Sequence, residues 1–132
     1  MKNLTNQLGT ALLIITHNLG VVARYADRIN VMYAGKIRES GTAEDVYMRP
    51  SHPYTVGLLN SVPRLDRPSS ARLDPIEGEI PDPSDLPPGC AFHPRCRWSS
   101  SKCSLEDPVL EPIENRQMVA CFESKSVARA TG

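Results

Sequence analysis

The sequence predicts an α/β fold that passes into an irregular, proline-rich module carrying four cysteines. The α/β part is indicated by Ala11–Thr16, a short apolar run rich in branched residues that is typical of a strand buried on both faces of a parallel sheet. The change of character is indicated by the prolines, because all 12 lie at or after Pro50 and each removes a backbone donor. Regular helices and strands are therefore expected mainly in the first part of the chain.

Residues 1–48 are expected to alternate helices and strands. The first helix begins at Met1 without a capping residue, which suggests that it is cut from a longer helix. Asn18 supplies a cap for the next helix, and Ala34-Gly35 makes a tight turn that closes a hairpin. In chain order the expected elements are a helix over 2–8, a strand over 11–16, a helix over 18–26, and strands over 28–34 and 36–40.

Two further helices are expected before the proline-rich part. Thr42 with Asp45 three residues later is a variant of the capping box and predicts a helix that ends before Pro50. His52-Pro53 begins the second helix, because proline is tolerated at the first helical position. This second helix belongs to a helical extension over 49–62.

The remaining chain is expected to form little regular structure. Residues 63–88 are rich in proline and predict an extended, semi-rigid linker. Residues 89–123 hold the four cysteines and a final strand over 117–122. The polar tail over 124–132 is expected to be disordered.

Charge and hydropathy exclude several classes of protein. Fifteen basic residues balance 15 acidic ones without a long run of either sign, so the electrostatic footprint of a nucleic-acid binder is missing. The longest apolar run is far shorter than the roughly 20 residues that span a bilayer. The amino terminus also lacks the layout of a signal peptide. We therefore expect a cytoplasmic chain with no membrane span.

His17 lies where the expected buried strand ends and the next helix begins. In open α/β sheets, ligands bind in the crevice at the carboxyl ends of the strands. One ring nitrogen there can donate to a phosphate oxygen or position a water while backbone holds the other. The alternative from position alone is a histidine satisfied by local hydrogen bonds at a strand end.

Four cysteines follow the linker, at Cys90, Cys96, Cys103 and Cys121. Structural zinc sites usually carry pairs of ligands two to four residues apart, and these cysteines are spaced more widely. His93 lies three residues after Cys90 and could complete a mixed site, but that would leave one cysteine over. Wider spacing suits an iron–sulfur cluster, whose thiolates lie farther apart. From spacing alone a cluster, a zinc ion, and disulfides or free thiols all stay open.

The stretch Leu12–Gly41 strongly resembles the region around the switch histidine in ATP-binding subunits of ABC transporters. The following Arg49–Pro63, with His52-Pro53 near its start, resembles the extension found in the oligopeptide and dipeptide importer branch. In that family the switch histidine contacts the γ-phosphate of ATP bound with Mg²⁺, and His17 matches its position. The family usually has aspartate next, whereas Asn18 stands here, which keeps the capping ability and removes a negative charge.

The cysteine segment also resembles a known module. Its motif runs Leu86-Pro-Pro-Gly-Cys-x-Phe-x-Pro-Arg-Cys96, with Cys103 shortly after and Val119-Ala-Cys121 near the end. The same arrangement is found at the carboxyl terminus of peptide-importer ATPases, where four cysteines bind a [4Fe–4S] cluster. The resemblance therefore implies that Cys90, Cys96, Cys103 and Cys121 are cluster ligands, with Zn²⁺ as the alternative metal. With all four positions matched, His93 is expected to be a loop residue. A structural or regulatory role is expected rather than a catalytic one.

Taken as a whole, the resemblance implies the C-terminal remnant of a P-loop ABC ATPase domain, followed by the cysteine module. The 132 residues contain no Gly-x-x-x-x-Gly-Lys-Ser/Thr loop, no serine-glycine-glycine signature segment and no apolar strand ending in Asp-Glu. We therefore expect a fragment that does not hydrolyse ATP alone.

The complete subunit is expected to pair with a second ATP-binding subunit and with transmembrane permease subunits. It would lie on the inner face of the cell membrane and drive the import of peptides. The alternative is a free-standing iron–sulfur or zinc binding module that acts as an adaptor or sensor.

Overall fold

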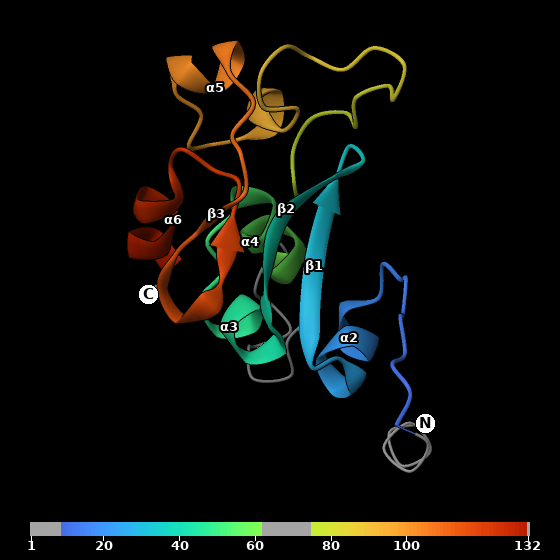
Figure 1. Cartoon of the computed structure of the whole chain (residues 1–132). Coiled ribbons are helices and arrows are strands. Elements are labelled where there is room, and N and C mark those ends of the chain that lie inside the picture. Colours follow the sequence, from blue (N-terminus) through green and yellow to red (C-terminus); the bar gives the residue numbers. More distant parts are fainter. Residues whose placement is uncertain (1–8, 62–74, 132) are drawn as a thin grey trace, which may run out of the picture.

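A computed structural model describes residues 9–61 and 75–131, and every structural statement below refers to these residues (Figure 1). They form short helices around one antiparallel sheet with the strand order β1-β2-β4-β3. The strands are β1 (Arg28–Tyr33), β2 (Lys36–Thr42), β3 (Glu111–Pro112) and β4 (Met118–Val119). The mixture of helices and strands agrees with the predicted α/β class.

The expected strand over residues 11–16 is wrong, because the structure has no strand there and the described sheet is antiparallel. The run is extended and exposed, and Leu13 and Ile15 expose 84% and 92% of their surface. A strand forms only when its backbone groups pair with a neighbour. Among the described residues no strand pairs with this run, so the backbone partner that a strand needs is missing.

The β1–β2 hairpin confirms the predicted strands and turn. Ala34 and Gly35 both have positive φ, at 50° and 76°, as the favoured two-residue hairpin turn requires. The register pairs Arg28 with Thr42 and Tyr33 with Lys36, and it shifts by one residue after Val31. Side chains of β1 alternate between exposed and buried, which places every second residue in the core.

Three helices of the first part begin where their caps predict. Asn18 Oδ1 accepts from the N–H groups of Gly20 and Val21, and Thr42 Oγ1 accepts from the N–H of Asp45. These helices are α2 (Leu19–Tyr25), α3 (Ala43–Met48) and α4 (Pro53–Asn60). The expected helix over 2–8 and most of the expected linker lie outside the described residues.

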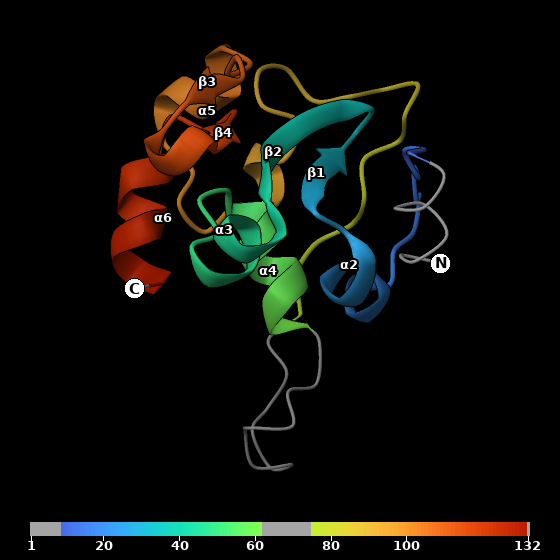
Figure 2. The ribbon, with the colours of Figure 1, turned by 60° about the horizontal axis from the view of Figure 1, so that its bottom comes forward.

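The C-terminal part returns to the hairpin. It contains the short helices η1 (His93–Arg95), α5 (Ser101–Leu105) and η2 (Glu114–Arg116), and the last helix α6 (Ser124–Thr131). Strand β4 pairs with β2, while the strand expected over 117–122 is reduced to Met118–Val119. Figure 2 shows the orange and red C-terminal segments beside the hairpin.

The disorder expected over 124–132 is not what the structure has. Residues Ser124–Thr131 form α6, which packs against α4, and Val127 is completely buried. The composition of this segment is polar, so its helical state is attributed to packing against α4 rather than to composition.

Two clusters of buried residues make up the core. Ile29, Val31 and Val46 form the first, between the hairpin and the helices. The second joins the hairpin to the cysteine segment and consists of Tyr33, Cys90, Ala91, Phe92 and Cys103. The half-buried ring of Tyr54 packs against both clusters, so the two parts share one core.

Candidate functional site: a pocket lined by four cysteines

The four cysteines that the sequence analysis proposes as ligands line one pocket, although up to 31 positions separate them in the chain. The enclosed space in this four-cysteine pocket is small, about 10 Å³, which is room for about one water molecule. The other lining residues include His52, Phe92, His93, Trp98 and Glu123. The structure therefore brings together all four positions that the sequence singled out.

Backbone contacts hold the cysteine-bearing segments in place. The N–H of Cys90 donates to the carbonyl oxygen of Cys103 over 2.8 Å, which joins the first and third cysteine segments. This approach depends on Gly89, whose φ is +70° and whose missing Cβ would lie 2.4 Å from the same carbonyl oxygen. The N–H of Ala120 donates to the carbonyl oxygen of Arg38 on β2 over 2.8 Å and so places Cys121 beside the hairpin.

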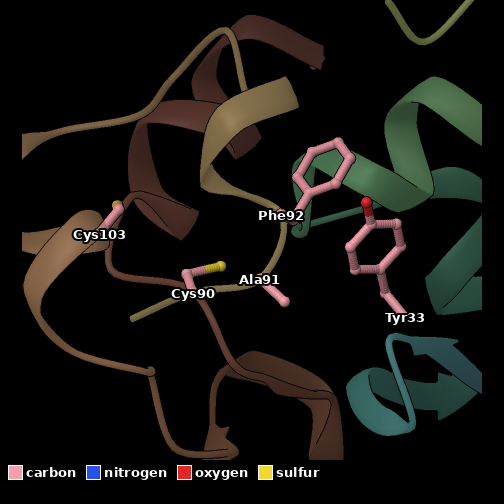
Figure 3. Packing of buried hydrophobic residues seen from close by; sticks show 5 residues of the cluster. All are labelled: Tyr33, Cys90, Ala91, Phe92 and Cys103. Carbon is pink, nitrogen blue, oxygen red and sulfur yellow. The ribbon is translucent and has the colours of Figure 1, made fainter. Parts of the chain in front are cut away.

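Figure 3 shows Cys90 and Cys103 on neighbouring segments, with the Phe92 ring turned toward Tyr33. The Phe92 ring meets Tyr33 edge-on at a centroid distance of 5.1 Å and lies 5.5 Å from the ring of Tyr54. Cys90 and Cys103 are themselves members of the buried cluster. The wall of the pocket is therefore continuous with the core.

None of the four cysteines forms a disulfide, and burial makes three of the thiols harder to ionise, because it raises their pKa values. Burial raises the pKa of Cys96 to about 11 and that of Cys121 to about 12, and it also raises the pKa of Cys90. Backbone N–H groups two residues farther along oppose these rises, at Phe92, Trp98 and Glu123. The other cysteines of the pocket raise the pKa values further, because one thiolate disfavours the next.

Four thiols around one small pocket form a donor set for a soft metal. Bound metal stabilises the thiolate, which would reverse the effect of burial on these cysteines. In the described part of the chain, however, no three His, Cys, Asp or Glu side chains converge closely enough to form a metal site. The Cys103 Sγ instead lies 3.5 Å from the hydroxyl of Ser100.

Two histidines line the same pocket, and the sequence assigned a possible site role to only one of them. His93 Nδ1 lies 3.0 Å from the carbonyl oxygen of Cys90, so this nitrogen carries the proton and donates. His52 is 1% exposed and caps α4, because its Nδ1 accepts from the N–H of Tyr54 over 3.1 Å. Burial, together with the charge of Arg38, lowers the pKa of His52 to about 3, so the ring is neutral.

The buried carboxylate of Glu39 binds the backbone at His52. Glu39 is fully buried on β2 and accepts from the N–H groups of Ser51 and His52 over 2.7 and 3.1 Å. The amide of Gln117 donates to the same carboxylate over 2.6 Å. Burial raises the pKa of Glu39, and these hydrogen bonds oppose the rise. Sequence reasoning missed this network, and its one local signal is the cap position of His52 before Pro53.

His17 lies apart from the four-cysteine pocket. It is exposed at a bend just before Asn18, whose N–H donates to the hydroxyl of Thr16 over 2.9 Å. His17 is not among the pocket-lining residues. The structure therefore presents two separate candidate regions, an exposed histidine at the start of α2 and a buried pocket with four thiols.

No helix within 9–61 and 75–131 is both long and apolar enough to cross a membrane.

Comparison with known proteins gives consistent matches. The family model described as oligopeptide/dipeptide transporter, C-terminal region, matches residues 38–103, from β2 through the third cysteine. An oligopeptide transport ATP-binding protein of Bacillus subtilis, AppD, is 44% identical over 122 residues, covering 92% of this chain and 37% of the relative. The protein of the same description from Mycobacterium tuberculosis, OppD, is 45% identical, covering 96% of this chain and 21% of the relative.

A third relative, the oligopeptide transport ATP-binding protein OppD of Haemophilus influenzae, is 40% identical over 124 residues. The match covers 94% of this chain and 38% of that relative. The chain thus spans less than two fifths of the length of each of these three relatives.

Proposed function

Because the chain belongs to the oligopeptide/dipeptide transporter C-terminal region family, we propose that it forms the C-terminal part of an ATP-binding subunit that couples ATP hydrolysis to peptide import. The observation that carries this proposal is one uninterrupted family match across β2, α3, α4 and three of the four cysteines. The relatives that match along nearly the whole chain are oligopeptide transport ATP-binding proteins by name.

The proposed role of His17 is to contact the γ-phosphate of ATP bound with Mg²⁺ by the rest of the subunit. Two observations support it. His17 is exposed, so a phosphate can reach the ring, and Asn18 fixes the start of α2 directly behind it. A histidine donor at that position would stabilise charge that develops on the transferred phosphoryl group.

The proposed role of the four-cysteine pocket is to bind a [4Fe–4S] cluster, with Zn²⁺ as the alternative. The fit rests on four free thiols around one pocket and on backbone N–H donors at three of them, a common feature of sulfur ligands in such sites. Cys90, Cys96, Cys103 and Cys121 would each provide one thiolate. Metal–thiolate bonds would cross-link segments whose own apolar core is small.

The proposed partners are a second ATP-binding subunit and the transmembrane permease subunits of an importer, at the cytoplasmic face of the membrane. Exposed apolar residues are available on the first part of the chain for contact with the remainder of an ATP-binding domain, and they include Leu12, Leu13, Ile14 and Ile15. On this proposal residues 1–48 belong to the nucleotide-binding domain, 49–62 to a helical extension, and 89–123 to the cysteine module.

The alternative, a free-standing metal-binding adaptor, is less well supported. The cysteine segment shares its core with the hairpin through Tyr33, Tyr54 and Phe92, and β4 pairs with β2. A module built to act alone would be expected to have a core of its own.

A chimeric subunit tests the transport function. The matched C-terminal 122-residue region of the Bacillus subtilis relative AppD is replaced by this chain, and peptide uptake is measured in cells that lack the native subunit. The expected result is uptake that depends on the chimera. A chimera that accumulates, reaches the membrane and still gives no uptake would overturn the proposal.

Anaerobic purification of the 132-residue chain tests the metal. Visible absorption with iron, sulfide and zinc analysis should give a brown protein with about four irons and four sulfides per chain. Single Cys→Ser variants at the four positions should lose iron, whereas Ser99→Ala in the intervening loop should keep it. A colourless wild-type protein with one zinc per chain would overturn the cluster and leave the transport proposal standing.

A further inference from the structure

Tyr47 lies on α3 and joins that helix to the first turn of α2, which begins two residues after His17. Its hydroxyl donates to the carbonyl oxygen of Leu19, 28 positions earlier in the chain. Among the residues that the structure describes, no other hydrogen bond connects the first turn of α2 to another element. The contact therefore lies close to the histidine that is proposed to meet the phosphate.

The backbone between Thr16 and Leu19 is held in shape by its own side chains. The N–H of Asn18 donates to Thr16 Oγ1 over 2.9 Å. Asn18 Oδ1 in turn accepts from the N–H groups of Gly20 and Val21 over 3.0 and 3.3 Å. These bonds reach at most three residues along the chain, so they fix the form of the bend but not its place relative to the other elements.

Packing holds α2 mainly away from His17. No residue of α2 is buried. Val22, in the middle of the helix, and Ala26, directly after it, are half-buried and pack against the first of the two buried clusters. The end of α2 that leads into β1 is therefore packed, whereas the end beside His17 is held by the hydrogen bond from Tyr47.

Tyr47 is itself firmly placed. Its half-buried ring packs against the same cluster, and its helix α3 is capped by Thr42 and buries Val46. Burial raises the pKa of Tyr47, and the N–H of Ala23 opposes the rise. The phenol therefore keeps its proton at neutral pH and can donate. Because Ala23 belongs to α2, its effect on the phenol also places the hydroxyl against that helix.

We infer that Tyr47 is a positioning residue for His17, which sets where the imidazole stands by binding the carbonyl oxygen of Leu19. This inference rests on the proposed contact of His17 with the γ-phosphate of ATP. A donor that stabilises developing charge must be in place before the reaction, and a displacement of about 1 Å can cost on the order of 100-fold in rate. Tyr47 would act through His17 and not on the nucleotide itself.

The test is a double-mutant cycle in the chimeric transporter. Tyr47→Phe removes the hydroxyl and keeps the ring in its cluster. It should lower kcat for ATP hydrolysis about tenfold, the effect of losing one hydrogen bond of ordinary strength. The KM for ATP should stay within about twofold, because the rest of the subunit binds ATP. In a His17→Ala background the same change should have no further effect. The matched control is Tyr25→Phe, which removes a hydroxyl from an exposed ring on α2 and should keep wild-type activity.

The outcomes of the cycle separate the inference from the function it rests on. An equal loss of activity with and without His17 would show that Tyr47 acts on stability alone and would overturn the inference. Full activity of Tyr47→Phe beside an impaired His17→Ala would also overturn it, and the proposed function would stand. If His17→Ala is itself fully active, the proposed role of His17 fails and the inference fails with it.

A second measurement does not depend on ATP. Relaxation of ¹⁵N nuclei in the 132-residue chain reports how firmly the backbone amides of His17 and Leu19 are held. Tyr47→Phe should lower the order parameters of both amides, and Tyr25→Phe should leave them unchanged. Unchanged order parameters in a folded Tyr47→Phe protein would show that the hydrogen bond does not hold the bend, and this would overturn the inference whatever the chimera does.

Discussion

Tyr33, at the end of β1, and Phe92, in the first cysteine segment, meet edge-on with ring centroids 5.1 Å apart. Both are buried, with 5% and 3% of their surface exposed. Fifty-eight positions of sequence, including the proline-rich part, lie between them. This contact makes the cysteine module an extension of the hairpin core.

The substitution Phe92→Ala should lower the free energy of unfolding by about 3–5 kcal/mol, because it removes a buried ring that contacts Tyr33, Tyr54 and His52. Urea unfolding followed by circular dichroism measures the change. Leu105→Ala is the control, since Leu105 is 79% exposed and should shift stability by less than about 0.5 kcal/mol. Equal effects of the two changes would show that the shared core does not hold the module.

Asp107→Asn should destabilise the chain by about 3 kcal/mol, because it leaves the buried guanidinium of Arg38 without its counter-charge. Asp107 accepts from Arg38 over 2.7 Å and from Lys36 over 2.6 Å. The exposed pair of Lys102 and Glu106, at 3.8 Å, gives the comparison, and Glu106→Gln should cost less than about 1 kcal/mol. Chemical unfolding of both variants at neutral pH measures the two losses of stability. Equal losses would show that the contact of Asp107 with Arg38 matters no more than the exposed pair.

Gly89→Ala should be more harmful than Gly35→Ala, although both glycines have positive φ. At Gly35 an added Cβ meets nothing within 4 Å, so the cost is the left-handed conformation alone, about 1–2 kcal/mol. At Gly89 the Cβ also collides with the carbonyl of Cys103. We expect Gly89→Ala to reduce both stability and iron uptake, whereas Gly35→Ala keeps iron uptake. Full iron content in Gly89→Ala would contradict this account.

The buried carboxylate of Glu39 gives a pH dependence with a defined sign. Burial raises its pKa above the ordinary value of 4.5, so the folded chain holds this proton more tightly than the unfolded chain. The stabilisation is fully present below pH 4.5 and is lost as pH rises through the raised pKa. Asp45, whose pKa the Thr42 hydroxyl and Arg49 lower, acts with the opposite sign below pH 3.8.

The free energy of unfolding should therefore fall with rising pH above 4.5 in wild type, relative to Glu39→Gln, which cannot titrate at this site. Urea unfolding at half-unit steps between pH 4 and 8 measures the difference between the two profiles. Parallel profiles over that range would show that Glu39 does not titrate there.

His17→Ala should leave the stability of the chain within about 0.5 kcal/mol of wild type, because the side chain is exposed. In the chimeric transporter the same change should reduce ATP hydrolysis on the order of 100-fold, the usual effect of losing a donor to transition-state charge. Thr10→Ala, which is also exposed, serves as control. A chimera that hydrolyses ATP equally well with alanine at position 17 would remove His17 from the reaction.

Local chemistry made part of this structure predictable. Asn18 and Thr42 cap helices through side chains that reach only two or three residues along the chain, and Ala34-Gly35 turns the hairpin by its own φ values. The common feature is that each signal and its effect lie within a few residues of each other.

Elements that depend on distant partners were harder to predict. The apolar run over 11–16 has the composition of a strand, but composition does not supply the neighbour that a strand needs. For α6 the opposite holds. Its sequence is polar and predicted disorder, yet the helix forms, packs against α4 and buries Val127. The cysteine spacing alone left a cluster, a zinc ion, and disulfides or free thiols open. The parts played by His52 and Glu39 depend on contacts between segments far apart in the sequence.

The bond between Glu39 and Gln117 joins residues 78 positions apart, and β2 pairs with β4 over the same span. Contacts of this range form late, because a long loop must close before they stabilise anything. During synthesis the hairpin would leave the ribosome before Gln117 has been made. The carboxylate of Glu39, which is buried in the folded chain, would stay exposed to water until then. Cys90, Cys96 and Cys103 therefore stay accessible as thiols until β4 has been made and can pair with β2.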